Sequence, residues 1–345
     1  MGILDLAAAN LLSPMILFFA LGMAAAAARS DLSIPEAVAK GMSLYLIMAI
    51  GFKGGAGVAA YGLDGKLIAA MIAGVILSAL MPVIAMTLLM RTTKLPRVDA
   101  AAVAAHYGSI SIVTFLAAGE MAASSGIPAE SFMVAVAAAM ETPAIFAGLI
   151  MAQVGIAAKT ATADATAYAH TPAQAPGGFF GGLDKESLRE VALNGSIVML
   201  IGAFAIGCIT GEDGLEAISP FIVSPFKGVL CLFLLDMGLI AGRGLREGAR
   251  TLSWPVLLFG LYMPLIGATL GAIAGVLCGL SAGGTALMMT LSASASYIAV
   301  PAAMRLALPE ARASIYLPLS LGVTFPFNLV LGIPLYVATA QAISA

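Results

Sequence analysis

Two short polar runs interrupt an otherwise apolar chain. The first is His106–Tyr107–Gly108–Ser109–Ile110–Ser111, and the second is Ser292–Ala293–Ser294–Ala295–Ser296–Tyr297, with Pro301 soon after. Glycine and proline weaken helices, and an interrupted helix exposes free backbone N–H groups at the positive end of its dipole. Serine hydroxyls add hydrogen-bond donors that suit a small oxyanion. The runs therefore predict an anion site made of Gly108, Ser109, Ile110, Ser111, Ser294, Ala295 and Ser296.

Oxygen-bearing side chains in apolar stretches are candidates for a coupling ion. Glu141 lies about a dozen residues into one stretch and precedes Thr142 and a proline, and carboxylates at such depth are costly and usually functional. Thr324 and Asn328 flank the matching proline of the second half and offer neutral oxygens. Asp236 is either a further ligand or a partner in an interhelix hydrogen bond. The ion is sodium or a proton, and its predicted ligands are Glu141, Thr142, Asp236, Thr324 and Asn328.

Simpler interpretations exist for the same residues. Serines in membrane helices often bond the carbonyl four residues earlier or allow close helix packing. His106 fits equally well as an interior histidine held by a hydrogen bond. The repetition of paired serines at related positions favours a binding role for them.

The composition indicates that these residues lie in a membrane. Of 345 residues, 61% are hydrophobic and 10% charged, and the mean hydropathy is +1.04. A soluble domain usually carries about 25% charged residues, so the bilayer must solvate most of these side chains. The net charge of −2 gives no reason to expect a nucleic-acid partner. The three cysteines form no metal or redox motif, so we expect no cofactor and no metal beyond sodium.

Hydropathy predicts an all-α membrane protein with ten transmembrane helices, each needing roughly 20 apolar residues. Residues 1–156 hold five spans, residues 157–187 form a linker rich in Ala, Thr, Gly and Pro, and residues 188–345 hold five more. Lysines and arginines gather in alternate loops, which predicts a cytoplasmic linker with both termini outside the inner (plasma) membrane of a bacterium. The predicted spans are 11–28, 36–52, 66–90, 98–123, 129–156, 188–210, 220–242, 252–279, 283–307 and 311–341.

The two halves repeat each other at an offset of about 185 residues. Gly22 matches Gly207, Gly55 matches Gly242, and the serine pairs and prolines follow in the same order. Five spans per repeat place the second copy upside down, so the prediction is two inverted five-helix repeats with crossed discontinuous helices. Such inverted repeats are a recurring basis of alternating access, which favours a secondary transporter.

Enzyme functions fit poorly. A membrane zinc protease needs HExxH, and the chain has only His106 and His170. His106 and Ser109 come close on one helix, but no oxyanion-hole pattern accompanies them, and no P-loop is present. Two alternatives to anion symport stay open: a proton- or sodium-coupled transporter or exchanger of small organic anions, and a membrane sensor or scaffold without transport.

The ordered motifs resemble the sodium-dependent bicarbonate transporter family. The resemblance covers Leu12–Ser13–Pro14 through Gly51–Phe52–Lys53–Gly54–Gly55, His106 to Ser111, Met140–Glu141–Thr142–Pro143–Ala144, and Ser292 to Pro301 with Arg305. It implies sodium–bicarbonate symport by a homotrimer, with Ser109, Ser111, Ser294 and Ser296 holding bicarbonate and Glu141 near sodium. A PII-like cytoplasmic regulatory protein is the partner of cyanobacterial members. Tyr297 departs from the cyanobacterial pattern, which has Asp at this position.

Overall fold

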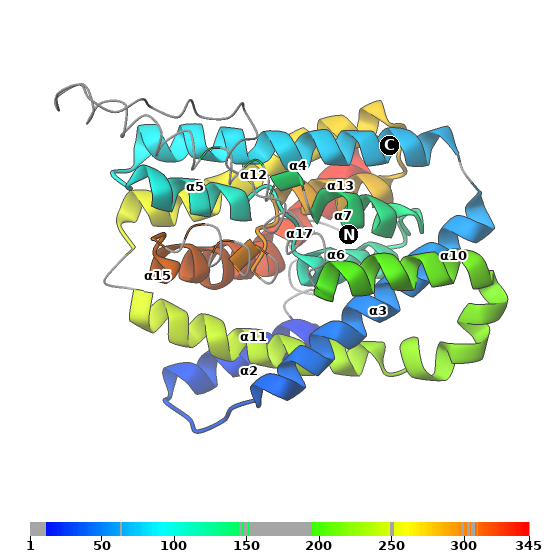
Figure 1. Cartoon of the computed structure of the whole chain (residues 1–345), viewed down its shortest axis with the longest axis horizontal. Coiled ribbons are helices and arrows are strands. Elements are labelled where there is room, and N and C mark those ends of the chain that lie inside the picture. The colour runs from blue at the N-terminus through cyan, green and yellow to red at the C-terminus, as the bar shows by residue number, and fades with distance from the viewer. Residues whose placement is uncertain are drawn as a thin grey trace, which may run out of the picture.

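Every element that the computed structural model describes is a helix (Figure 1). The described residues are 12–62, 64–141, 143–144, 147, 151, 195–248, 252–297, 300–301, 304, 308 and 310–344. Among them, six helices are long and apolar enough to cross a membrane. The chain is therefore an all-helical, multi-pass membrane protein. Five of these six are α3 (Glu36–Tyr61), α4 (Gly65–Thr92), α10 (Gly195–Ile222), α11 (Phe226–Gly248) and α12 (Trp254–Leu277), and the sixth is the helical run from Ala313 to Ser344.

Shorter helices occupy the other predicted spans. The first span is α2 (Pro14–Ala27), which starts at a Ser13 cap, and the tenth is a run of α-helical and π-helical turns from Ala313 to Ser344. The fifth is described only at its start, and the linker 157–187 lies outside the described residues. The shorter elements are α5 (Arg97–His106), α6 (Ile112–Ser124), α7 (Met133–Glu141), α13 (Ala282–Ala293), α15 (Ala313–Leu317), η1 (Pro318–Thr324), α16 (Phe325–Phe327), η2 (Asn328–Gly332) and α17 (Ile333–Ser344).

One predicted boundary is displaced. The sequence predicts that the sixth span ends near residue 210, where Gly211 separates two helical segments of α10, and that the seventh begins near 220, whereas α11 begins at Phe226. Gly211 has φ 60° and ψ −147°, a backbone conformation that glycine adopts readily, and it bends α10. A second helical segment beyond the bend carries the acidic residues Glu212, Asp213 and Glu216.

Two helix pairs cross at glycines that allow backbones to touch. A methyl group on Gly22 of α2 would overlap the carbonyl oxygen of Leu235 on α11. A methyl group on Gly207 of α10 would overlap the carbonyl oxygen of Phe52 on α3. Small residues at such crossings are the usual means of close packing in a membrane, where burial in lipid supplies little driving force between helices.

These contacts match residues of the first half to residues of the second half differently from the sequence alignment of the halves. Gly55 lies against the Phe204 carbonyl oxygen, and Gly238 lies against the Phe19 carbonyl oxygen. The contacts therefore make Gly55 the counterpart of Gly238, whereas sequence matching pairs it with Gly242. Both α3 and α11 carry glycines four residues apart, so a slip of one helical turn still places glycine on glycine.

The helices form two groups. The first, here called the crossing layer, comprises α2, α3, α10 and α11, which pack mainly on one another; α2, α3 and α11 run together in the lower part of Figure 1. The second, here called the core group, comprises α4 to α7, α12, α13 and the run from α15 to α17. The two groups meet chiefly where α11 lies along α15 and η1, and where α3 and α10 touch α7.

We predict that Gly207→Ala lowers stability by about 1–3 kcal/mol, because the added methyl group forces two backbones apart. Gly202→Ala, on the same helix, is the matched control, since an added methyl group there meets nothing within 4 Å. Thermal unfolding in detergent measures both. Equal midpoints for the two variants would contradict the close crossing.

Candidate functional site: two interrupted helices that cross

The fourth predicted span is interrupted between α5 and α6. Helix α5 ends at His106, α6 begins at Ile112, and the residues between them are buried. A methyl group on Gly108 would overlap the ring of Pro82 within α4 and approach the Ser78 carbonyl oxygen to 2.7 Å. Only glycine allows the chain to pass so close to α4 at this point.

The ninth span is interrupted in the same way. Helix α13 ends at Ala293, the next four residues are not helical, and helical structure is present again at residues 300–301. Gly267 of α12 lies against the carbonyl oxygen of Ser292, so α12 supports this break as α4 supports the first. Ile110 and Ala295, which we predicted to line the site through their backbones, have buried side chains.

Two hydrogen bonds join the breaks directly. The Ser111 backbone N–H donates to Ser294 Oγ at 2.9 Å, and the Ser296 backbone N–H donates to the His106 carbonyl oxygen at 2.8 Å. Ser111 also caps α6, because its Oγ accepts from the Thr114 backbone N–H at 3.2 Å. The positive end of the α6 dipole therefore points at the crossing. The start of the helix beyond the second break falls outside the described residues.

Four buried polar atoms at these breaks have no hydrogen-bond partner among the described residues. They are His106 Nε2, Ser109 Oγ, Ser292 Oγ and Tyr297 OH. Leaving such a group unpaired costs about 1–3 kcal/mol, so folded proteins seldom keep several together without a ligand. Thr285 Oγ1, near the start of α13 and away from the break, is also unpartnered. Ser292 carries one of these atoms, although our prediction of the site left it out of the polar run.

The protonation of His106 follows from its hydrogen bond. Nδ1 lies 2.6 Å from the Ala102 carbonyl oxygen, which can only accept, so Nδ1 carries the proton. In the neutral ring Nε2 is then an acceptor, and it is the atom left without a partner. The breaks thus present three hydroxyl groups and one acceptor nitrogen.

Thr324 and Asn328 hold the breaks in place. The Tyr107 hydroxyl pairs with Thr324 Oγ1, which itself donates to the Gly260 carbonyl oxygen at 2.8 Å. Asn328 Nδ2 donates to the carbonyl oxygen of Ala293, the last residue of α13, at 2.9 Å. Both predicted ion ligands therefore lie at the crossing, and the structure engages them with the backbone and neighbouring hydroxyls.

Among the described residues, no hydrogen bond or ion pair joins the predicted acidic residues Glu141 and Asp236 to the breaks. Glu141 ends α7, and the Ser78 hydroxyl bonds the carbonyl oxygen of the preceding Met140 at 2.6 Å. The carbonyl oxygen of Ser78 also approaches Gly108 in the first break. Glu141 therefore directly follows a residue, Met140, that is hydrogen-bonded to the support of this break. Asp236 is buried on α11 of the crossing layer, in a different group of helices. Thr142 lies outside the described residues.

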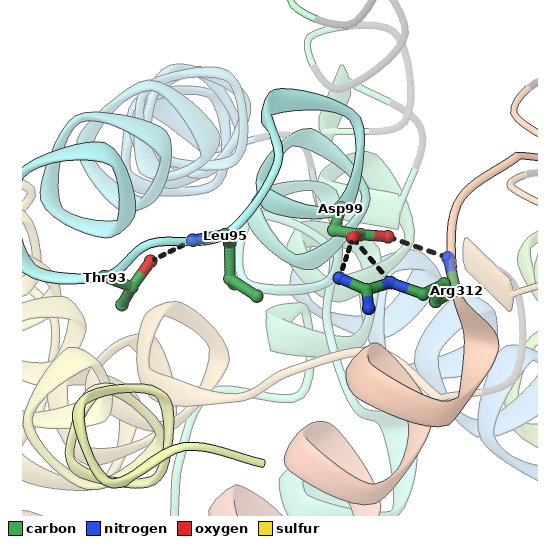
Figure 2. Close-up of polar contacts among 4 residues, drawn as sticks. All are labelled: Thr93, Leu95, Asp99 and Arg312. Atoms are coloured by element: carbon green, nitrogen blue, oxygen red, sulfur yellow. Dashed lines mark hydrogen bonds and ion pairs between the residues drawn. The ribbon is translucent and has the colours of Figure 1, made fainter. Parts of the chain in front are cut away.

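An ion pair that our sequence analysis did not identify ties α5 to the start of α15. Figure 2 shows the Arg312 side chain and backbone N–H both turned toward Asp99. The guanidinium donates to Asp99 Oδ2 at 2.9 and 2.6 Å, and the backbone N–H donates to Oδ1 at 2.8 Å. The hydrogen bonds and charge of Asp99 raise the pKa of Arg312. A lone acid beginning a run of alanines was the available signal for this pair.

A cavity of about 580 Å³ leads to the second break. Its lining comes from the later part of α11, including Met237 and Arg243, from Tyr297, and from Ser314 and Pro318. The Tyr297 ring packs edge-on against Phe325 at 5.1 Å, and Phe325 packs against Phe19 of α2 at 5.2 Å. The cavity therefore reaches the crossing from the end of α11 that carries arginines.

Interrupted helices meeting inside a helical membrane protein are typical of secondary transporters, which build substrate sites from broken helices. Residues 14–341 match the profile of the Na+-dependent bicarbonate transporter superfamily, and the chain belongs to that family. No curated protein matches the chain. The match covers both breaks and all described helices except the final residues of α17, and it places the chain in a transporter family rather than an enzyme family.

We predict that Asp99→Asn lowers the thermal unfolding midpoint, because a charge-assisted hydrogen bond is worth about 1.5–3 kcal/mol. Asp64→Asn serves as the control, since Asp64 precedes α4 without making a side-chain cap. Unfolding monitored by circular dichroism in detergent compares the two variants. An Asp99→Asn midpoint no lower than the control would show that the pair does not hold α5.

Proposed function

We propose that this protein is a sodium-coupled bicarbonate symporter that works by alternating access. One observation carries the proposal: in a chain of this transporter family, buried and unpartnered polar atoms gather at the crossing of two interrupted helices. A bound anion would supply the partners that these atoms lack.

The chemistry of the crossing suits bicarbonate in particular. Bicarbonate carries oxygens that accept hydrogen bonds and one hydroxyl that donates. Ser109, Ser292 and Tyr297 supply hydroxyl donors, and the amide-rich start of α6 favours negative charge. His106 Nε2 supplies the acceptor that the hydroxyl of bicarbonate requires, and a simple carboxylate would leave that nitrogen unpartnered. Ser111, Ser294 and Ser296 shape the site through the hydrogen bonds that join the breaks.

Sodium would bind beside the anion. We assign Glu141 as its charged ligand, with Thr142, Thr324 and Asn328 as nearby oxygens, because a hard cation prefers carboxylate, carbonyl and hydroxyl oxygens. The carbonyl ends of α5 and α13 also point their negative dipoles at the crossing. A cation and an anion bound together nearly cancel in charge, so each favours the occluded state only when the other is present.

The exchanged contacts of the crossing layer support an inverted repeat. Gly22 meets α11 as Gly207 meets α3, so each half gives its first helix to the second helix of the other half. With five spans in each half, as proposed, such a duplication is upside down and the two halves can exchange conformations. The cavity beside Arg243 would then open to the cytoplasm, and both termini would lie outside. The homotrimer and the PII-like partner remain predictions.

We predict that Ser109→Ala with Ser292→Ala abolishes bicarbonate uptake without lowering stability, because neither hydroxyl has a protein partner to lose. Ser124→Ala is the control on α6, where the hydroxyl bonds the Met121 carbonyl oxygen away from the break. Labelled bicarbonate uptake into proteoliposomes and thermal unfolding are measured together. Wild-type uptake by the double variant would place the anion elsewhere.

We also predict that uptake needs an inward sodium gradient. Glu141→Gln should lower the ratio of uptake in sodium buffer to uptake in potassium buffer by about tenfold or more, since a carboxylate dominates the binding of a hard cation. Uptake in sodium and potassium buffers is compared for both proteins. Equal uptake in sodium and potassium buffers would contradict sodium coupling. Uptake driven instead by an acidic exterior would favour the proton-coupled exchanger of small organic anions.

A further inference from the structure

Three charged side chains from different helices meet at one end of the protein. Lys227 Nζ at the start of α11 lies 2.6 Å from Glu120 Oε2 on α6. Lys53 of α3 lies over the Phe226 ring, with Nζ 4.5 Å from its centroid, and is acted on by the charges of both Glu120 and Lys227. Lys227 thus pairs with Glu120 directly, and Lys53 lies near enough for the charges of both to act on it.

This cluster joins the two groups of helices. Lys53 and Lys227 belong to the crossing layer, whereas Glu120 belongs to the core group, because α6 packs on α13 and α17. The cavity lies at the other end of the same α11 helix, at residues 237–244, about 15–25 Å along its axis. The Lys227–Glu120 ion pair therefore joins the two groups at one end of α11, whereas at the Arg243 end a cavity lies between α11 and residues 313–321 beside their packing contacts.

The register set by the glycine contacts adds a second observation. Phe52 and Leu235 play the same part in the two crossings, so Lys53 of α3 corresponds to Asp236 of α11. Each charge is expensive within a span and is retained for a reason. The equivalent positions carry opposite signs, with the cation beside the closed end and the carboxylate beside the open one. A negative substrate would meet attraction on one side and repulsion on the other.

We propose that Lys53 and Lys227 form an outer receiving site for small oxyanions and that Glu120 is its latch. The carboxylate of Glu120 occupies, in this closed state, the position that a substrate anion takes when the two groups part. The incoming anion replaces Glu120 as the partner of the lysines and so removes the contact that keeps this end shut. This inference rests on the proposed function, because it assumes that the chain moves an anion between two sides.

The exposure of the pair is consistent with a latch. The Lys227 side chain is 70% exposed and that of Glu120 is 30% exposed. An ion pair this open to water contributes little to stability, so it is weak enough to break in every cycle. Two lysines at an opening still raise the local concentration of an anion and its rate of arrival.

The latch is tested by access to the crossing, in a variant whose three native cysteines are replaced by alanine and which carries Tyr297→Cys. A membrane-impermeant thiol reagent is applied to right-side-out and inside-out vesicles. In the parent variant, labelling is expected mainly from the inside. Adding Glu120→Gln or Lys227→Gln should raise labelling from the outside by about fivefold, the effect of one partly exposed pair. The exchange Glu120→Lys with Lys227→Glu should return labelling to the parent level.

The receiving role is tested by kinetics in right-side-out vesicles. Lys53→Gln should raise the outside KM for bicarbonate by about fivefold at low salt and less at high salt, because salt screens the attraction between this partly exposed cation and an incoming anion. Lys66→Gln is the control, a lysine at the start of α4 outside the cluster. An unchanged KM in Lys53→Gln would overturn the receiving role.

The outcomes separate this proposal from the proposed function. Outside labelling that is identical in the parent, Glu120→Gln and Lys227→Gln variants would overturn the latch even if the protein transports bicarbonate. Absence of bicarbonate uptake would overturn the proposed function, while the labelling experiment would still decide whether Glu120 and Lys227 close the outer end.

Discussion

The two hydrogen bonds between the breaks are the contacts on which the remaining architecture depends. Inside a bilayer no water is available to satisfy a backbone that leaves the helix, so an interrupted span is stable only where protein groups replace the lost bonds. Here each break supplies part of what the other needs: Ser294 Oγ accepts from the Ser111 N–H, and the His106 carbonyl oxygen accepts from the Ser296 N–H. Each break therefore depends on the other for one of its backbone hydrogen bonds.

The surrounding helices serve that crossing. Gly108 and Gly267 let α4 and α12 lie directly against the two breaks, and Asn328 satisfies the carbonyl oxygen at the end of α13. On the opposite side, the crossing layer is assembled from backbone-to-backbone contacts at glycines. One group of helices is thus organised around polar atoms, and the other around close packing. A boundary between groups built on different interactions is a natural place for relative movement, and the cavity lies at that boundary.

The unpaired atoms at the crossing give the site its chemical character. Ser109 and Ser292 are buried and have no partners among the residues described, although ordinary folding would favour replacing them with alanine. Their cost is best understood as free energy recovered when a ligand binds. Neutral His106 adds an acceptor to this set of donors, and under the proposed function this combination distinguishes bicarbonate from an anion without a hydroxyl.

The sequence by itself determined the solvent, the class of fold and the location of both breaks. Its apolar composition required a membrane, and the runs at Ser109 and Ser294 are local signals, since glycine and neighbouring hydroxyls weaken a helix wherever it lies. The tertiary structure decided what those residues contact. The correspondence that the sequence predicts between residues of α3 and residues of α11 was off by one helical turn, because each helix has two glycines four residues apart. Only the contacts of Gly55 with Phe204 and of Gly238 with Phe19 resolve it. The Asp99–Arg312 and Glu120–Lys227 pairs join distant segments, and no local pattern encodes such a meeting. Backbone preference is a property of neighbours in the chain, whereas partnership between side chains depends on how whole helices pack.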